Sequence, residues 1–204
     1  MSVNTNHAPE KERDSLMFLR TLATVASCTL LAVASSSHLN AQMGGMNLLQ
    51  AGAKTPASPP ATANVTLNGK TVTINYSSPR LKGRTIGSDI VPYGEVWRTG
   101  ANPATTLITA TNLKIGTLDV PAGTYTIFTL PSKGQWLFIV SKKTGEWGIP
   151  YPEGNDLGRT PMTSKPVASS QEDMSISFEN THDASTQLHV KWGTTDQYVT
   201  VKAQ

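Results

Sequence analysis

The dipeptide Asn68-Gly69, set between two alternating apolar runs, is the feature that most constrains the fold of this chain. Both residues of a two-residue type I′ turn need φ above zero, which Asn and Gly adopt at low cost. The pattern therefore predicts a β-hairpin with one apolar face. The residues at every second position on the two sides of the turn are Val65, Leu67, Val72, Ile74 and Tyr76.

Short β-like segments separated by turns recur through the rest of the chain. After residue 41, no segment repeats apolar residues at the spacing of a helix. We therefore predict an all-β fold, an antiparallel β-sandwich or jelly-roll-like arrangement of about eight to ten strands. Trp136 and Trp192 lie in strand patterns and are predicted core residues. The strands are expected near residues 65–67, 72–76, 105–111, 113–120, 124–131, 135–142, 174–178, 188–192 and 198–201, and the segment 135–142, apolar on both faces, is expected to be central.

The start of the chain resembles an export signal. Residues 21–34 form an uncharged, mostly apolar run, and a small-residue segment follows and ends at Ala41. This is the pattern of a secretory signal peptide, and the run is too short to cross a bilayer, which takes about 20 apolar residues. We predict a signal peptide over residues 1–41, with Met17 as an alternative start. The protein is then exported to the periplasm or the exterior and keeps no transmembrane span.

Cys28, the only cysteine, lies inside this apolar run. The residues Val25-Ala26-Ser27 before it loosely match a lipoprotein cleavage site, so a lipid anchor on Cys28 is an alternative to cleavage after Ala41. If cleavage follows Ala41, the mature chain has no disulfide, no thiolate metal ligand and no cysteine nucleophile.

Composition predicts a linker and one folded domain. Residues 42–63 are rich in Gly, Ala, Pro and Ser, which predicts a flexible linker, and residues 64–204 are long enough for a single β-sandwich domain with its own core. The chain carries 17 Lys+Arg and 14 Asp+Glu, a formal net charge of +3, without a basic block. A nucleic-acid partner is therefore not expected.

The stretch Tyr76–Thr106 concentrates charge, aromatic rings and turn residues in one irregular segment, and it supports two hypotheses. In the first, Arg98 lies three residues after Glu95, and its guanidinium fork pairs with that carboxylate and with loop carbonyls and so fastens the loop to the sandwich. The residues of this structural clasp would be Arg80, Arg84, Glu95 and Arg98. In the second, aromatic faces and charges bind a small polar ligand at a mouth formed by residues 80–102 and 146–159. The ligand-binding residues would be Tyr93, Glu95, Trp97, Arg98, Asn102 and Trp147.

Several catalytic and metal chemistries lack support. His182 and His189 are the only histidines after residue 41, and His189 is expected to point to solvent because its neighbours Leu188 and Val190 are apolar. No metal-ligand motif, no cofactor motif and no phosphate-binding glycine loop is present, although a calcium site at Glu153 and Asp156 is conceivable. Carboxylate pairs that could serve a hydrolase are Asp89 with Glu95, and Glu146 with Glu153.

Several longer motifs carry a family resemblance. They are YSSPRLKGR, VPYGEVWRTGANPATT, VPAGTYTIFTLP with its following QW, TGEWG, and a late strand that ends in Trp192. In these motifs, across residues 64–204, the chain resembles the bacterial family known as domain of unknown function 2911. The resemblance implies an exported, β-rich protein and supplies no activity, substrate or catalytic residue. Members commonly carry an acidic residue where this chain has Pro103, so no role for that carboxylate carries over.

These observations favour a non-catalytic binding or structural module of the cell envelope. Its partner would be a small polar ligand or an envelope protein, with no cofactor and no metal. A hydrolase that acts on carbohydrate or cell-wall material through loop carboxylates is the alternative. A pure assembly module that pairs through exposed strand edges is a third hypothesis. The sequence does not indicate an oligomeric state.

Overall fold

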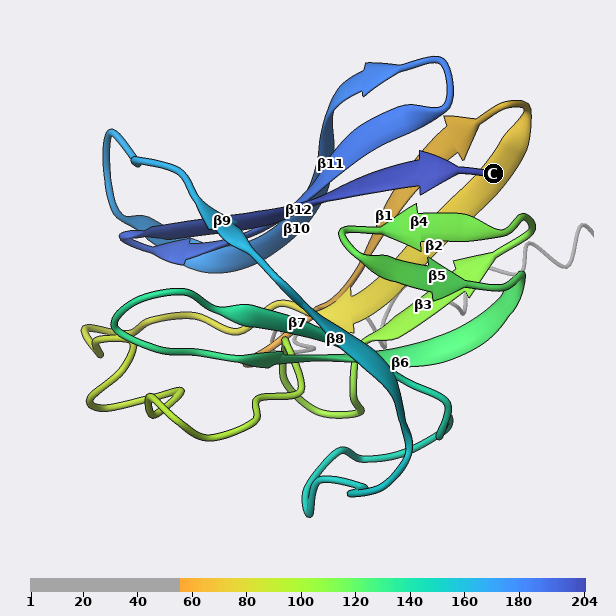
Figure 1. Ribbon diagram of the computed structural model, residues 1–204. Helices are drawn as coiled ribbons and strands as arrows, with labels where there is room; N and C mark the ends of the chain where they lie inside the picture. The colour runs from red at the N-terminus through yellow and green to blue at the C-terminus, as the bar shows by residue number, and fades with distance from the viewer. Residues whose placement is uncertain (1–55) are drawn as a thin grey trace, which may run out of the picture. The chain divides into compact units, whose positions relative to one another are not determined.

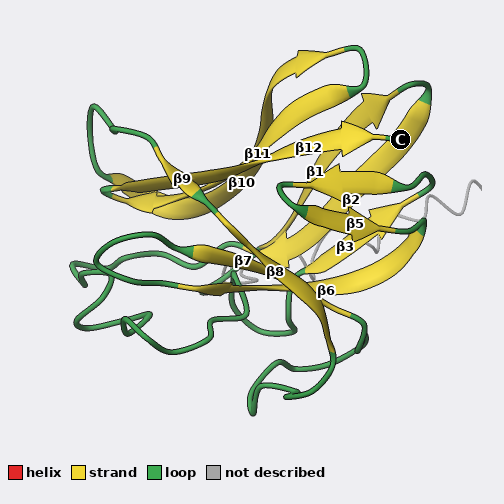
Figure 2. Ribbon diagram, viewed as in Figure 1, coloured by secondary structure: helices red, strands yellow, loops and turns green. Residues whose placement is uncertain are grey.

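The computed structural model describes residues 56–204, in which every regular element is a β-strand. The strands form two antiparallel sheets that face each other (Figures 1 and 2). The predicted all-β antiparallel sandwich is confirmed. There are twelve strands rather than eight to ten. One reason is that the segment expected as a single strand over 113–120 is a hairpin that turns at Gly116, which has φ 54°.

The first sheet has the strand order β1-β2-β3-β6-β7-β8, and the second has the order β10-β11-β12-β4-β5, with β9 paired to β12. Most neighbours in each sheet are consecutive in the chain, so hairpins build most of both layers. The strands of the first sheet are β1 (Pro60–Leu67), β2 (Lys70–Ser77), β3 (Thr106–Thr109), β6 (Gly123–Leu130), β7 (Leu137–Ser141) and β8 (Asp156–Pro161). Those of the second are β4 (Leu113–Ile115), β5 (Leu118–Val120), β9 (Thr163–Ser164), β10 (Gln171–His182), β11 (Ser185–Gly193) and β12 (Thr195–Ala203).

The predicted hairpin at Asn68-Gly69 joins β1 to β2. Asn68 has φ 48° and Gly69 has φ 72°, as a type I′ turn requires, and Leu67 pairs with Lys70 directly across it. This strand begins at Pro60, inside the segment 42–63 that the sequence predicts as a linker. β1 therefore begins four residues before residue 64, where the sequence places the start of the domain. The alternation already runs through the small Ala61 and Ala63, whose side chains give a weak apolar signal.

The main core lies between the two sheets, and a second apolar layer lies outside the first sheet. On β7, Phe138, Ile139 and Val140 are all fully buried, which confirms the prediction of a strand covered on both faces. Ile139 packs on the outer side with Phe128 of β6, beneath Ala104 and Tyr151 from two loops. Trp136 and Trp192 lie in the main core, as predicted. The loops are thus tied to the sheet by apolar packing as well as by hydrogen bonds.

Close contacts join the two sheets at both edges. At one edge, the β4–β5 turn meets β8, where the backbone N–H of Thr117 donates to Thr160 Oγ1 at 3.0 Å. At the other, the chain after β2 adds to the start of β10, where Leu81 N donates to Glu172 O at 3.0 Å and Met174 N donates to Pro79 O at 2.9 Å. The loop that follows β2 therefore begins from a fixed position.

The predicted signal peptide, the alternative start at Met17 and the lipid-anchor alternative at Cys28 all fall outside the described residues. Within residues 56–204, no helix is long and apolar enough to cross a membrane.

Candidate functional site

The long loop between β2 and β3 makes up most of the stretch Tyr76–Thr106. Its centre is anchored to the first sheet. The backbone of Trp97 exchanges two hydrogen bonds of 2.8 Å with Thr129 on β6. Thr105 then closes the loop, because its hydroxyl donates to the carbonyl of Thr99 at 2.8 Å. The loop is yellow-green in Figure 1 and lies at one end of the first sheet. It is therefore a fixed part of the fold.

Two β-branched residues in this loop adopt the left-handed backbone conformation. Val91 has φ 52° and Thr99 has φ 51°, and both are buried. Such residues cost about 1–3 kcal/mol each and persist where the surroundings hold them, most often at functional sites. For Thr99 the surroundings are visible: its hydroxyl contacts Thr129 Oγ1 at 3.3 Å inside the protein. The loop thus stores strain in the same segment that concentrates aromatic and charged residues.

A cavity of about 420 Å³ opens beneath this loop. Trp97 and Trp192 form part of its wall, and their rings stack with centroids 5.7 Å apart. Its volume falls in the usual range of small-molecule sites, about 300–1,000 Å³, and its lining is mostly apolar, as such sites are. The sequence predicted Trp97 as a site residue. It did not place Trp192 there, because the two residues meet only through the packing of distant strands.

The charged groups that line the cavity are Arg84, Glu95 and Arg98. Arg84 donates from Nε to Leu81 O and from Nη2 to Arg80 O, while Arg98 donates from Nη1 to Trp147 O at 3.1 Å. Partial burial lowers the pKa of Arg98 from its ordinary value, because a guanidinium loses hydration there. Within residues 56–204, no acidic side chain forms an ion pair with either arginine. The expected Glu95–Arg98 pair does not form.

Arg98 joins the β2–β3 loop to a second loop, residues 142–155, through contacts with Trp147. Its guanidinium lies 5.3 Å from the ring centroid of Trp147 while it bonds the Trp147 carbonyl. The close approach depends on Gly148, since a Cβ there would lie 2.9 Å from Ala104 Cβ and 3.1 Å from Arg98 Cβ. Ile149 from the same loop, with 66% of its surface exposed, lines the cavity. Residues of both loops therefore line the cavity.

The other residues of the two hypotheses lie around the cavity rather than in it. Tyr93 lines a smaller neighbouring pocket of about 140 Å³, and Asn102 donates from Nδ2 to the carbonyl of Ser58 at 3.1 Å. Trp147 is 56% exposed and lies outside the cavity lining. Arg80 pairs with Asp173 of β10 at 2.8 Å. Arg80 and Arg98 therefore bond groups outside this loop, whereas both bonds of Arg84 stay within it, and none of the three uses Glu95.

A family model described as "Protein of unknown function (DUF2911)" matches residues 58–201. The chain belongs to this family. No curated protein and no solved structure matches the chain. The matched range covers both sheets except the last two residues of β12, so the loop and its cavity lie within the DUF2911 region.

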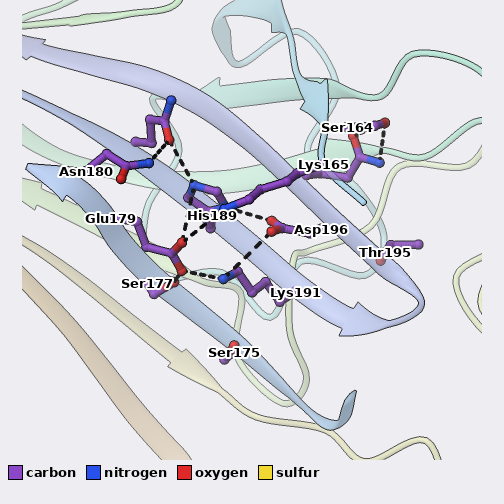
Figure 3. Close-up of polar contacts among 12 residues, drawn as sticks. Ser164, Lys165, Ser175, Ser177, Glu179, Asn180, His189, Lys191, Thr195 and Asp196 are labelled. Carbon is purple, nitrogen blue, oxygen red and sulfur yellow. Dashed lines mark hydrogen bonds and ion pairs between the residues drawn. The ribbon is translucent and has the colours of Figure 1, made fainter. Parts of the chain in front are cut away.

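A second polar centre of this DUF2911 domain lies on the outer face of the second sheet (Figure 3). His189 of β11 is fully buried, and its Nδ1 lies 2.7 Å from Asp196 Oδ1 of β12. The prediction that His189 points to solvent is therefore wrong. Its side chain does face away from the main core, but its ring stacks on Tyr198 at 4.9 Å between centroids, and side chains from the neighbouring strands cover it.

This outer-face network contains, besides His189 and Asp196, the charged side chains Glu179, Lys191 and Lys165. Lys191 Nζ bonds Glu179 Oε1 and lies 3.7 Å from Asp196 Oδ2, so this cation meets two carboxylates. The hydrogen bond from Lys191 holds the pKa of Glu179 below its ordinary value against the opposing effect of burial. Burial acts to lower the pKa of Lys191, but its bond to Glu179 and the charge of Asp196 outweigh this effect and raise it.

The network follows from strand register, which the sequence alone does not reveal. Lys191 pairs with Asp196, His189 pairs with both Ser177 and Tyr198, and all of these side chains share one face. The alternation of polar and apolar residues in β11 and β12 could have indicated that these side chains share one polar face. Only the pairing shows that opposite charges meet there. A smaller polar cluster joins Tyr151 of the second loop to Asp156 and Arg159 of β8.

In that cluster, Asp156 accepts hydrogen bonds from the Tyr151 hydroxyl and from Arg159 Nε, the latter at 2.7 Å. Burial, followed by the bond to Asp156, raises the pKa of Tyr151 to about 12. The conceivable calcium site used Asp156 and Glu153, yet Asp156 is engaged by a cation and a phenol. Within residues 56–204, no three metal-ligating side chains come together in a way that could hold an ion.

Proposed function

We propose that this DUF2911 protein is a non-catalytic binding module whose small-molecule site is the cavity beneath the β2–β3 loop. The observation that carries the proposal is a cavity of ligand size in which Arg84 and Arg98 have no acidic partner within residues 56–204. Arg98 is partly desolvated, and a ligand carboxylate that pairs with it offsets the cost of that lost hydration.

Two features of the site support binding over an entirely structural role. The walls are fixed by the Trp97–Thr129 backbone pair and the strained Thr99, so the site is formed before a ligand arrives. The rim includes Ile149 from the second loop, which keeps 66% of its surface exposed. Preformed walls and an exposed apolar rim are typical of binding sites.

The alternative hydrolase has weaker support. A glycosidase needs two carboxylates about 5–9.5 Å apart across a cleft. Among the described residues that line the cavity, Glu95 is the sole carboxylate. Asp89 accepts a hydrogen bond from Thr85 N within the loop, and Glu146 lies 3.6 Å from Lys143. These interactions favour binding without hydrolysis.

Export to the cell envelope is part of the proposal. It is supported by the apolar run over residues 21–34 and the small-residue segment that ends at Ala41. A binding module in the periplasm or outside the cell would meet small solutes directly, which agrees with a preformed and accessible cavity. Amino-terminal sequencing of the protein recovered from the cell envelope tests this part, since an intact start at residue 1 or 17 would contradict it.

The binding proposal is tested by filling the cavity. Ala101 lines it, so Ala101→Trp should occupy its volume, whereas Ala122→Trp places the same ring on an exposed turn outside it. A small-molecule library is screened against the full chain by thermal shift. We expect ligands that raise the melting temperature of the wild type and of Ala122→Trp but not of Ala101→Trp. Ligands that stabilise all three proteins equally would contradict the proposal.

A further inference from the structure

The aromatic wall of the cavity offers carbon surface rather than hydrogen-bonding groups. The indole N–H of Trp97 donates to Gly100 O at 3.0 Å, and that of Trp192 donates to Glu172 O at 3.0 Å. Both polar ends of the stacked rings are therefore engaged by the protein's own backbone. A ligand that touches this wall gains mainly from burying apolar area and from stacking.

Few polar groups remain to satisfy a hydroxylated ligand. The polar side chains that line the cavity are Ser58, Arg84, Glu95 and Arg98, and apolar side chains make up most of the rest. A sugar would bring hydroxyls on every carbon into this space. Each hydroxyl that loses water without gaining a partner costs about 1–3 kcal/mol. The lining therefore disfavours a carbohydrate and favours a ligand with a largely apolar body.

The charges on the lining specify the polar end of the ligand. Two guanidinium groups and one carboxylate leave a net charge of +1, and Arg98 has donors beyond the one it uses on Trp147 O. An arginine fork matches a carboxylate in shape and can bind it through two parallel N–H bonds. A single carboxylate balances the charge, whereas a phosphate monoester near −2 would leave an excess beside Glu95.

We propose that the ligand of this cavity is a monocarboxylate with a flat, apolar ring body, an inference that rests on the binding function proposed above. Its carboxylate meets the guanidinium groups of Arg84 and Arg98. Its ring lies against Trp97, which is itself stacked on the buried Trp192, and Ile149 covers its outer edge. Hydrophobic contact supplies most of the affinity, and the arginines select the charge.

Calorimetric titration of the full chain with a matched set of probes tests this class. The probes are 2-naphthoate, its neutral isostere 2-naphthamide, 2-naphthyl phosphate, and glucuronate as a carboxylate on a hydroxylated ring. We expect 2-naphthoate to bind at least about tenfold more tightly than each of the others, as loss of a charge-assisted hydrogen bond predicts.

Arginine variants connect the selectivity to the site. Arg84→Met and Arg98→Met should each weaken 2-naphthoate binding by about tenfold or more and leave the affinity for 2-naphthamide nearly unchanged. Arg159→Met is the matched control, because Arg159 lies in the Tyr151–Asp156 cluster outside the cavity. Circular dichroism verifies that each variant folds. Since Arg98 also joins the two loops, Arg84→Met alone decides the test if Arg98→Met unfolds.

The outcomes separate the ligand class from the proposed function. Equal affinity for 2-naphthoate and 2-naphthamide, or tighter binding of glucuronate or of the phosphate, overturns the monocarboxylate inference and leaves the cavity as a binding site. Equal loss of 2-naphthoate affinity in Arg159→Met and Arg84→Met also overturns the inference. No saturable binding by any of the four probes overturns the inference, and with no ligand found in the library screen it overturns the proposed function as well.

Discussion

The cavity beneath the β2–β3 loop and the network on the outer face of the second sheet use similar residues for opposite purposes. In the network, Lys191 meets Glu179 and Asp196, and buried His189 meets Asp196 at 2.7 Å. In the cavity, Arg84 and Arg98 meet backbone carbonyls and no acidic side chain within residues 56–204. The charges of the network are paired with one another, whereas the two arginines and one glutamate that line the cavity leave a net charge of +1.

This difference separates a structural arrangement from a binding one. A charged side chain that is paired with side chains of neighbouring strands helps to fix the register of those strands. It keeps few hydrogen-bonding groups free for a ligand. A charge at the rim of a preformed apolar cavity keeps unused donors, which a ligand can occupy. Changes in the network should therefore alter stability and leave binding intact, and changes in the cavity should do the reverse.

The largest effect on stability is expected at Asp196. Asp196→Ala removes the carboxylate that bonds buried His189 and faces Lys191, so both are left without this partner. We expect a loss of about 3 kcal/mol in the free energy of unfolding, measured by chemical denaturation, with the affinity of the cavity for 2-naphthoate unchanged. Asp119→Ala, which breaks an exposed pair with Lys114, is the control and should change the free energy of unfolding far less, because solvent screens that pair. Equal effects of the two substitutions would contradict the structural role of the network.

Gly148→Ala tests the junction of the two loops. The added methyl group would crowd Ala104, Arg98 and Phe128, and the residue has φ 84°. Gly145 has φ 72° in the same loop and nothing within 4 Å, so Gly145→Ala controls for backbone strain alone. We expect Gly148→Ala to lower the free energy of unfolding by about 1–3 kcal/mol more than Gly145→Ala and to weaken binding in the cavity. Equal losses would show that the loops do not depend on this contact.

The pH dependence of stability should reveal the Glu179 pair. The pKa of Glu179 is lower in the folded protein than the ordinary value of 4.5, so the folded state binds a proton on this carboxylate less readily than the unfolded chain does. The stability that Glu179 contributes is therefore present above about pH 4.5 and is lost as the pH falls through the folded pKa. We expect Glu179→Gln to cost about 1 kcal/mol at pH 7 and to differ less from the wild type in acid. A difference that stays constant from pH 7 to pH 3 would exclude this contribution.

The smallest effect is expected for Arg80, which also belongs to the clasp hypothesis. Its pair with Asp173 is about half exposed on both sides, and surface ion pairs contribute about 0–1 kcal/mol. Arg80→Met should therefore change the melting temperature little and leave 2-naphthoate binding unaltered. A large loss of stability would mean that the attachment of the loop to β10, rather than its pairing with β6, holds the cavity in shape.

The sequence predicts those parts of this fold that depend on local geometry. Asn68-Gly69 specifies its hairpin because the turn and its flanking alternation lie within one short segment. Rings and charges in an irregular segment are unusual, which marked Trp97 and Arg98 as candidate site residues, and both line the cavity. His189 was misjudged because alternation shows only which face a side chain takes, and the partners that bury it come from β10 and β12.

Local patterns do not reveal contacts between distant segments, and this also explains the wrong predictions at the site. The spacing of Glu95 and Arg98 favours a local pair, but Gly148 lets the second loop approach closely enough for Arg98 to bond the Trp147 carbonyl instead. Trp192 was expected only in the core, and its contact with Trp97 depends on how β11 lies against the loop. Contacts between distant segments decide these details, and no local pattern encodes them.

The indole resonances of the four tryptophans offer the most direct test of the central claim, that the cavity binds and the rest of the sandwich supports it. Trp97 and Trp192 line the cavity, whereas Trp136 is buried in the core outside its lining. In a nitrogen-15 NMR titration of the full chain with 2-naphthoate, we expect saturable shifts of the Trp97 and Trp192 indole N–H signals and an unchanged Trp136 signal. Equal shifts of all these signals, or no saturable shift of Trp97 and Trp192, would contradict the account.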